Sequence, residues 1–218
     1  MKNAFRTMLL FGTLLILSLL IACASQPHKA QVPLPDLSIG VASFVQPTND
    51  LELMAGYIPD KQGMIDPGSL LGLDTALRTA LNQTSRSYKY LDPIPLLAEQ
   101  RIQRSDQPGR SSALAYWINI GKKAGVDLLI VPMIIDWRER EGSNAGVTIS
   151  AAITTDMFLI DTRGQGNLLQ RSFYREKQVG LSSNLLNITT FAKRGGRWVT
   201  AEELAQEAMQ KAIQEFGL

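Results

Sequence analysis

The feature that most constrains the fold of this chain is an almost continuous apolar run from Leu128 to Ile135. A short apolar run rich in Leu, Ile and Val is typical of a strand that is buried on both faces of a sheet. Pro132 interrupts the run. Because proline offers no N–H to a strand ladder, we expect a bulge or a sheet edge at this residue. The run therefore predicts a sheet with other elements packed against it.

Further strands are predicted on both sides of this run. Residues 37–44 alternate between apolar and small or polar side chains, and residues 86–91 suit a short strand. Residues 147–160 alternate most clearly and predict one long, half-buried strand. A glycine-rich turn follows at 161–167, and residues 168–178 are expected to return beside the long strand.

Helices are predicted between and after these strands. Ser69 is expected to cap a helix whose leucines recur at helical spacing, and residues 111–124 predict a second helix that ends at Gly125. Residues 95–103 suit a short helix. Thr200 and Glu203 form a capping-box pattern that opens the last helix.

The element order is thus β-α-β-α-β-β-β-α, which predicts one α+β domain over residues 36–218. We expect a mixed, mainly antiparallel sheet of about five strands with helices packed on it.

The amino terminus carries a secretion signal. Lys2 and Arg6 precede an uncharged, mainly apolar stretch that is too short for a spanning helix, which needs about 20 residues. The stretch ends at Leu20-Ile21-Ala22-Cys23, which is similar to the bacterial lipobox. Residues 1–22 are therefore predicted to be a lipoprotein signal peptide. We expect Cys23 to receive a diacylglycerol group and an N-acyl chain, the only covalent additions predicted.

Residues 23–35 are small, polar and proline-containing, and predict a flexible lipidated tether. Ala24 follows the cysteine where an aspartate would favour retention in the inner membrane. We therefore expect an outer-membrane lipoprotein that faces the periplasm. No other cysteine exists, so an intrachain disulfide is excluded.

Charge and histidine content exclude several functions. The chain has 22 basic and 20 acidic residues, and loss of the leader with Lys2 and Arg6 leaves 20 of each. This balance argues against a nucleic-acid partner. The one histidine, His28, lies in the predicted tether, so neither a histidine-based catalytic triad nor a zinc or other metal site is expected.

Two segments are candidates for a functional site. Asp136, Glu139 and Glu141 alternate with arginines after the buried strand, and we interpret them as a charged strand end rather than a catalytic acid–base pair. Residues 181–198 combine apolar side chains with arginines and a tryptophan, which are types that interface centres favour. The candidate interaction residues there are Leu185, Leu186, Phe191, Arg194, Arg197 and Trp198. The alternative is that these residues cover a sheet edge and fix the last helix.

Two motifs carry a family resemblance. Residues 124–131, AGVDLLIV, resemble a junction of helix, Gly-hydrophobic-Asp and buried strand, and residues 157–162, MFLIDT, resemble a hairpin before a glycine turn. Both are similar to periplasmic lipoproteins whose domain resembles the amino-terminal domain of TolB and the curli-secretion protein. This family includes the Pel lipoprotein and an activator of a peptidoglycan synthase. The resemblance implies an α+β fold and brings no catalytic residue.

These observations predict a non-enzymatic, lipid-anchored protein that takes part in envelope export or assembly by binding envelope proteins or its own copies. The alternatives are a carboxylate-based enzyme that acts on cell-wall glycan and a periplasmic protein that binds a small ligand.

Overall fold

A five-stranded mixed sheet organises the computed structural model, which describes residues 36–92, 110–178 and 188–218. All described residues belong to one compact unit, Pro33–Leu218. The predicted leader, Cys23, the tether, the helix at 95–103 and the candidates Leu185 and Leu186 lie outside the described residues. The elements in chain order are β1 (Ile39–Val41), the 3-10 helix η1 (Asp50–Glu52), α2 (Pro67–Leu81), β2 (Tyr88–Tyr90), α4 (Arg110–Ala124), β3 (Leu128–Arg138), β4 (Glu141–Gly142), β5 (Val147–Ile149), β6 (Ala152–Asp161), β7 (Asn167–Lys177), α5 (Ile188–Lys193) and α6 (Ala201–Phe216).

The strand order β2-β1-β3-β6-β7 confirms the predicted α+β class. Strand β1 pairs in parallel with β2 and β3, whereas the long pairings of β6 with β3 and β7 are antiparallel. The chain crosses from β1 to β2 through α2 and returns past β1 to β3 through α4. Because such crossovers are right-handed and these two run in opposite directions, their helices belong on opposite faces of the sheet.

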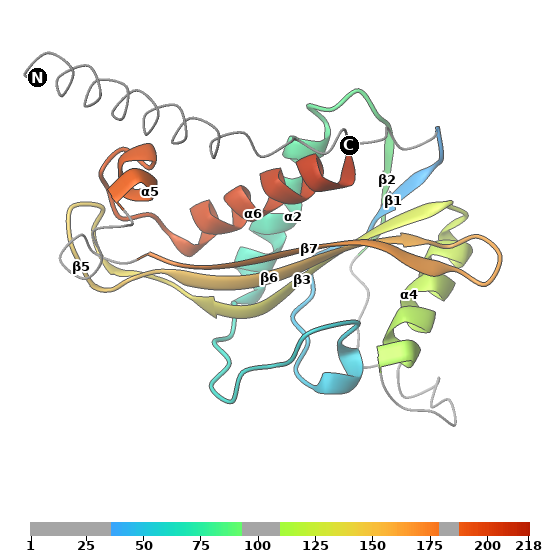
Figure 1. The fold of residues 1–218 in the computed structure, drawn as a ribbon, viewed down its shortest axis with the longest axis horizontal. Coiled ribbons are helices and arrows are strands. Elements are labelled where there is room, and N and C mark those ends of the chain that lie inside the picture. Colours follow the sequence, from blue (N-terminus) through green and yellow to red (C-terminus); the bar gives the residue numbers. More distant parts are fainter. Residues whose placement is uncertain (1–35, 93–109, 179–187) are drawn as a thin grey trace, which may run out of the picture. The chain divides into compact units, whose positions relative to one another are not determined.

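Each face of the sheet has its own hydrophobic core. Helices α2 and α6 cover one face, and α4 with η1 covers part of the other, as Figure 1 shows. Burying a leucine side chain completely stabilises the fold by about 1.5–3 kcal/mol, so helical leucines at this spacing contribute strongly. The first core includes Leu73, Leu77, Leu81, Leu159 and Leu204, and the second includes Tyr116, Trp117, Val131, Met133 and Phe158.

Pro132 lies in a central strand without a bulge, so the expectation for this residue was wrong. It pairs with Met157, and the ladder irregularity falls between Ile134 and Asp136 instead. Strand β1 ends at Val41, and the segment after it pairs with β3 again only at the bridge between Val45 and Met133. The sheet therefore tolerates the missing N–H of Pro132.

The predicted strand 147–160 is divided in two, which corrects a second expectation. Strand β5 pairs only with β4 in a small hairpin, and β6 begins at Ala152 in the main sheet. Ala151 between them is fully buried, and its carbonyl oxygen accepts a hydrogen bond from the Gln178 N–H at 3.2 Å. The alternation of side chains continues through this break, which is why the sequence did not reveal it.

Helix α2 begins three residues earlier than predicted. Asp66 is its cap, because the Asp66 Oδ1 accepts a hydrogen bond from the Ser69 N–H at 2.9 Å, and Pro67 occupies the first turn. The expected capping box of the last helix is confirmed, since Thr200 and Glu203 bond to each other's backbone. Gly125 adopts the predicted left-handed conformation at the end of α4, with φ of 67°.

Asp127 connects the starts of the parallel strands β1 and β3. Its Oδ2 accepts hydrogen bonds from the Ser38 N–H at 3.0 Å and the Ser38 hydroxyl at 2.7 Å. These bonds lower the pKa of Asp127 below its ordinary value. The aspartate of the junction motif thus aligns the starts of β1 and β3.

Candidate functional site

The predicted interaction residues that the structure describes make contacts within the chain. Phe191 packs edge-on against Trp198, with ring centroids 6.2 Å apart. Arg197 binds Glu203 on α6, and Arg194 binds both Glu207 on α6 and Glu176 on β7. Whether Phe191 and Trp198 also contact a partner stays a prediction.

Arg194 is the centre of a charged cluster that joins α5, β7 and α6. Its side chain is only 8% exposed, and its Nε and Nη2 donate to the two carboxylate oxygens of Glu207 at 2.8 and 2.7 Å. Burial opposes the charge of Arg194, but Glu207 and Glu176 outweigh it and raise its pKa. The Tyr174 hydroxyl donates to Glu207 at 2.7 Å, and burial together with this bond raises the pKa of Tyr174. Arg194 therefore stabilises the fold and is not free to bind a partner.

The exposed surface with the features of a binding site is instead the half of the sheet that α4 does not cover. In Figure 1, α4 lies below one end of the sheet, and no described helix lies below the other end. Alternate residues of β7 face this side: Arg171, Phe173, Arg175 and Lys177, which we call the β7 stripe. All four are exposed, and Phe173 is 44% exposed.

A hollow of about 300 Å³ lies beside the stripe, between the sheet and the loop after η1. Its apolar lining comes from Tyr57, Pro59, Ile135 and Phe173, and its polar lining includes Thr154 and Arg175. Mostly apolar walls with a few polar groups are usual for binding pockets.

An ion pair between the partly exposed Arg171 and the buried Asp156 lies in the floor of this hollow. Arg171 donates from Nε to Asp156 Oδ1 at 2.7 Å and from Nη2 to Oδ2 at 2.6 Å. Asp156 is 1% exposed, and burial raises its pKa although the bonds from Arg171 act in the opposite direction. The pair satisfies both buried carboxylate oxygens, and the Arg171 guanidinium also lies 5.1 Å from the Phe173 ring centroid.

Several hydrogen bonds hold the loop that forms the opposite wall. The Gln62 Nε2 donates to the carbonyl oxygens of Pro47 and Ile135 at 2.9 and 2.8 Å. The Gly63 N–H donates to Asp136 Oδ1 at 2.7 Å, and the Gly63 carbonyl accepts from the Trp137 N–H. An added Cβ on Gly63 would lie 1.9 Å from the Trp137 carbonyl oxygen, so only glycine permits this approach. The loop therefore attaches to β3 at its bulge, which shapes the hollow.

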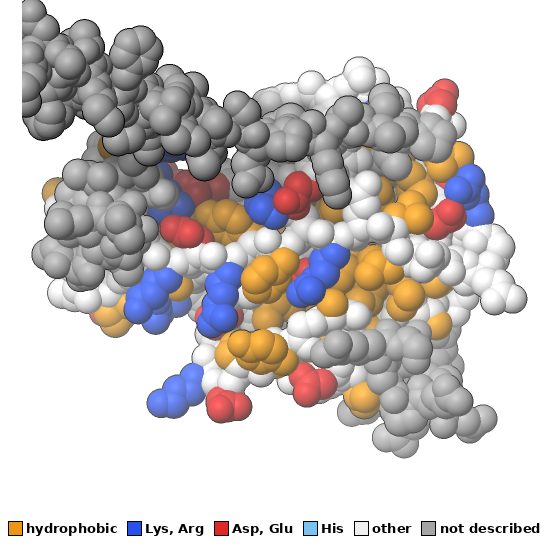
Figure 2. Space-filling model, viewed as in Figure 1, with side chains coloured by type: hydrophobic (Ala, Val, Ile, Leu, Met, Phe, Trp, Pro, Cys, Tyr) orange, Lys and Arg blue, Asp and Glu red, His pale blue; other side chains and the backbone are white. Residues whose placement is uncertain are grey.

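Positive charge is concentrated on the β7 stripe. In Figure 2, basic side chains and a hydrophobic one alternate in a row where Figure 1 places β7. Among the residues that the structure describes, Arg175 and Lys177 form no ion pair, whereas Arg171 is neutralised by Asp156. Glu176 points to the other face of the sheet, where it binds Arg194. The stripe therefore offers two uncompensated cations beside an aromatic ring.

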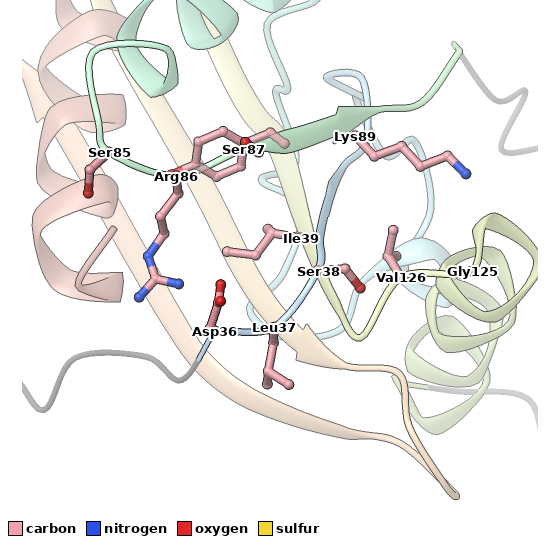
Figure 3. A pocket seen from close by; sticks show the side chains of 11 residues that line it. Asp36, Leu37, Ser38, Ile39, Ser85, Arg86, Ser87, Lys89, Gly125 and Val126 are labelled. Atoms are coloured by element: carbon pink, nitrogen blue, oxygen red, sulfur yellow. The ribbon is translucent and has the colours of Figure 1, made fainter.

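A second hollow, of about 800 Å³, lies at the start of β1 and β2. Figure 3 shows it surrounded by residues 36–39, residues 85–89 and the Gly125-Val126 junction. Two of its polar side chains are already bonded, since Ser38 donates to Asp127 and the Lys89 Nζ donates to the Ala124 carbonyl at 2.6 Å. We therefore rank this hollow below the one beside β7.

The three carboxylates considered for catalysis have separate roles. Asp136 accepts from the Gly63 N–H, as described above, whereas Glu139 accepts from the Ala201 N–H at the start of α6 at 3.2 Å. Glu141 is exposed in the small hairpin. Among the described residues, no group of three His, Cys, Asp or Glu side chains is arranged to hold a metal ion.

The binding features of β7 escaped the sequence analysis, which treated residues 168–178 only as a partner strand. The signal was present as the period-two series Arg171, Phe173, Arg175 and Lys177. It places a large apolar residue among cations on one face. Whether that face is covered depends on α4, which the sequence does not place.

Comparison with known proteins identifies no family. No protein-family model matches the sequence, and a search of curated proteins also finds no match. Several solved structures are similar in part, including the following three. A PelC dodecamer from Paraburkholderia phytofirmans has a TM-score of 0.46 and 9% identity over 85% of this chain and 94% of that chain. The hypothetical protein CT253 from Chlamydia trachomatis has a TM-score of 0.43 and 7% identity over 83% and 95% of the two chains.

The third is the lipoprotein GNA1162 from Neisseria meningitidis, with a TM-score of 0.35 and 15% identity over 73% of this chain and 96% of that chain. Similarity of this degree carries no inference about what the present chain binds. The resemblance to TolB-like lipoproteins stays a prediction. None of the described helices is long and apolar enough to cross a membrane.

Proposed function

We propose that this chain is a lipid-anchored protein of the bacterial envelope that acts by binding another protein through the uncovered half of its sheet. One observation carries the proposal: the β7 stripe places the exposed ring of Phe173 next to Arg175, which forms no ion pair among the described residues, beside a preformed hollow. Aromatic and arginine side chains are enriched at the centres of protein interfaces.

The position of β7 supports the same proposal. It is an edge strand, and within the described residues its second side pairs with no other strand. At 11 residues it is much longer than β2, the edge strand at the other side of the sheet, which has 3. An unpaired edge of this length is able to accept an added strand from a partner, and its basic side chains oppose aggregation with copies of itself.

The proposed anchor is Cys23, followed by the tether at residues 23–35. One acyl chain gives only marginal membrane binding at about 0.8 kcal/mol for each buried methylene, whereas several chains anchor a protein stably. We propose an outer-membrane location on the basis of Ala24. Separation of the two membranes by density would contradict this location if the protein moved with the inner membrane.

We further propose that the protein is not an enzyme. The support is chemical, because Asp136 and Glu139 each accept a backbone N–H and Glu141 stands apart in a solvent-exposed hairpin. Glu139→Gln and Glu141→Gln, at residues away from the proposed surface, should each leave the cellular function intact. Loss of function in one of these variants, with normal folding, would favour the glycan-enzyme alternative.

Photo-crosslinking in intact cells tests the binding surface. A photoreactive amino acid placed at Tyr57 or Lys177, which flank the hollow, should crosslink to one defined envelope protein. The control position is Leu71 on α2, which is 60% exposed against 64% for Tyr57 but lies outside the proposed surface. Equal crosslinking from Leu71, or none from Tyr57 and Lys177, would contradict the proposal.

A further inference from the structure

We propose that the hollow beside β7 binds one aromatic side chain of an acidic, extended segment of the partner. The inference rests on the proposed function and specifies the chemistry of its partner: an aromatic residue followed, at every second position, by carboxylates.

The hollow suits a single large side chain. Its volume of about 300 Å³ lies at the small end of the range for ligand pockets. Tyr57 and Phe173 form two of its walls and are 64% and 44% exposed, so a guest ring would cover apolar surface that water now contacts. Two aromatic walls also favour the edge-to-face packing that aromatic pairs adopt.

The charges around the hollow define what should flank the guest ring. The Asp156–Arg171 pair in the floor is mutually neutralised and attracts neither sign strongly. Asp136 lies on the β3 side, where its Oδ1 already accepts the Gly63 N–H. Arg175 and Lys177 remain, both on the β7 side, so the carboxylates of the guest should lie along this strand.

The spacing follows from the geometry of a strand. Phe173, Arg175 and Lys177 face one side of the sheet at a period of two residues. A guest segment paired with the free edge of β7 has the same period, so backbone hydrogen bonds supply affinity and alternate side chains supply specificity. Its pattern is therefore aromatic-x-acidic-x-acidic for one strand direction and the reverse for the other.

Binding of synthetic peptides to the purified full-length protein tests this pattern. The probes are dansylated, end-blocked Gly-Trp-Ser-Glu-Ser-Glu-Gly and its reversed sequence, measured by fluorescence anisotropy at low salt. At least one of them should bind. Replacement of the tryptophan by alanine, or of both glutamates by lysine, should weaken binding by roughly tenfold or more.

Protein variants locate the binding site. Phe173→Ala and Arg175→Glu should each weaken binding by roughly tenfold. Leu169→Ala is the matched control for the first, because Leu169 is 43% exposed on the same strand but does not line the hollow. Lys193→Glu on α5 is the control for charge reversal, and both controls should bind within roughly twofold of the wild type. Circular dichroism spectra and melting temperatures verify that all four variants fold.

The inference is overturned if both probes fail to bind, if the lysine peptide binds equally well, or if binding to Phe173→Ala is unchanged. Competition by indole-3-acetate at the affinity of the peptide would also overturn it, because the site would then hold a small ligand. If crosslinking from Tyr57 and Lys177 persists while these peptides fail, the proposed function stands and only the partner chemistry is wrong.

Discussion

Arg194→Met should destabilise the protein far more than the matched change Arg197→Met. Arg194 makes three hydrogen bonds to carboxylates on two elements, at 2.8 and 2.7 Å to Glu207 and 3.2 Å to Glu176. Arg197 makes an equally good bidentate contact with Glu203, at 3.0 and 2.6 Å. The two differ in burial, since the Arg194 side chain is 8% exposed and that of Arg197 is 46% exposed.

The burial of each arginine determines how much stability its replacement is expected to remove. Removing one partner of a fully buried ion pair costs about 3–5 kcal/mol, because the other charge remains unsolvated. Glu207 and Glu176 are partly exposed and can be hydrated after Arg194 is lost, and Glu207 keeps its bond from Tyr174. We therefore expect Arg194→Met to cost about 2 kcal/mol. Arg197→Met should cost clearly less, because exposed ion pairs contribute little to stability.

Urea unfolding followed by circular dichroism measures both variants. A loss of about 2 kcal/mol corresponds to a fall in melting temperature of roughly 4–8 °C for a chain of this size. The inference about burial is refuted if the two variants lose equal stability, or if Arg194→Met unfolds like the wild type. A double-mutant cycle with Glu207→Gln should recover most of the loss as coupling energy.

The pH dependence supplies a second measurement on the same pair. Burial acts to raise the pKa of Glu207, but hydrogen bonds from Arg194 and Tyr174 outweigh it and lower the pKa below its ordinary value of 4.5. A lowered pKa in the folded state means that Glu207 stabilises the fold fully above 4.5, and that this contribution is lost as the pH falls through the folded value. The difference between the wild type and Arg194→Met should therefore be largest at neutral pH and shrink below pH 4.5.

Four further outcomes are expected. Gly72→Ala on α2 should stabilise the protein by about 0.5–1 kcal/mol, since its added methyl meets nothing within 4 Å. Gly121→Ala on α4 should destabilise it by about 1–3 kcal/mol, because the methyl would lie 2.3 Å from Thr162 Cγ2. Urea unfolding would contradict these two expectations if Gly72→Ala and Gly121→Ala changed the free energy of unfolding in the same direction. Thr200→Ala should cost about 1 kcal/mol by removing the capping box of α6. A loss below about a quarter of this value would argue against a role for the cap. Labelled palmitate should enter the wild type but not Cys23→Ala, and equal labelling would contradict the lipid anchor.

The strand that carries the candidate site could be predicted from the sequence, but the exposure of its face could not. The sequence correctly predicts a strand over residues 168–178, and the alternation of Arg171, Phe173, Arg175 and Lys177 lies within this strand. It did not show that this face is uncovered, because that depends on where α4 packs. Conversely, Arg194 resembled an interface residue, yet its partners Glu176 and Glu207 lie 18 and 13 residues away and meet it only in the folded chain.

Local sequence patterns suffice to predict the α+β class, the capping box of α6, the left-handed Gly125 and most strands, because these follow from side-chain periods and backbone preferences within one segment. The tertiary structure alone decided the strand order β2-β1-β3-β6-β7, the break at Ala151, the bulge after Ile134 and the hollow beside Phe173. Each of these depends on contacts between segments far apart in the chain. Local patterns predict which side chains share a face, but only packing decides which face is covered by another element and which is exposed to water.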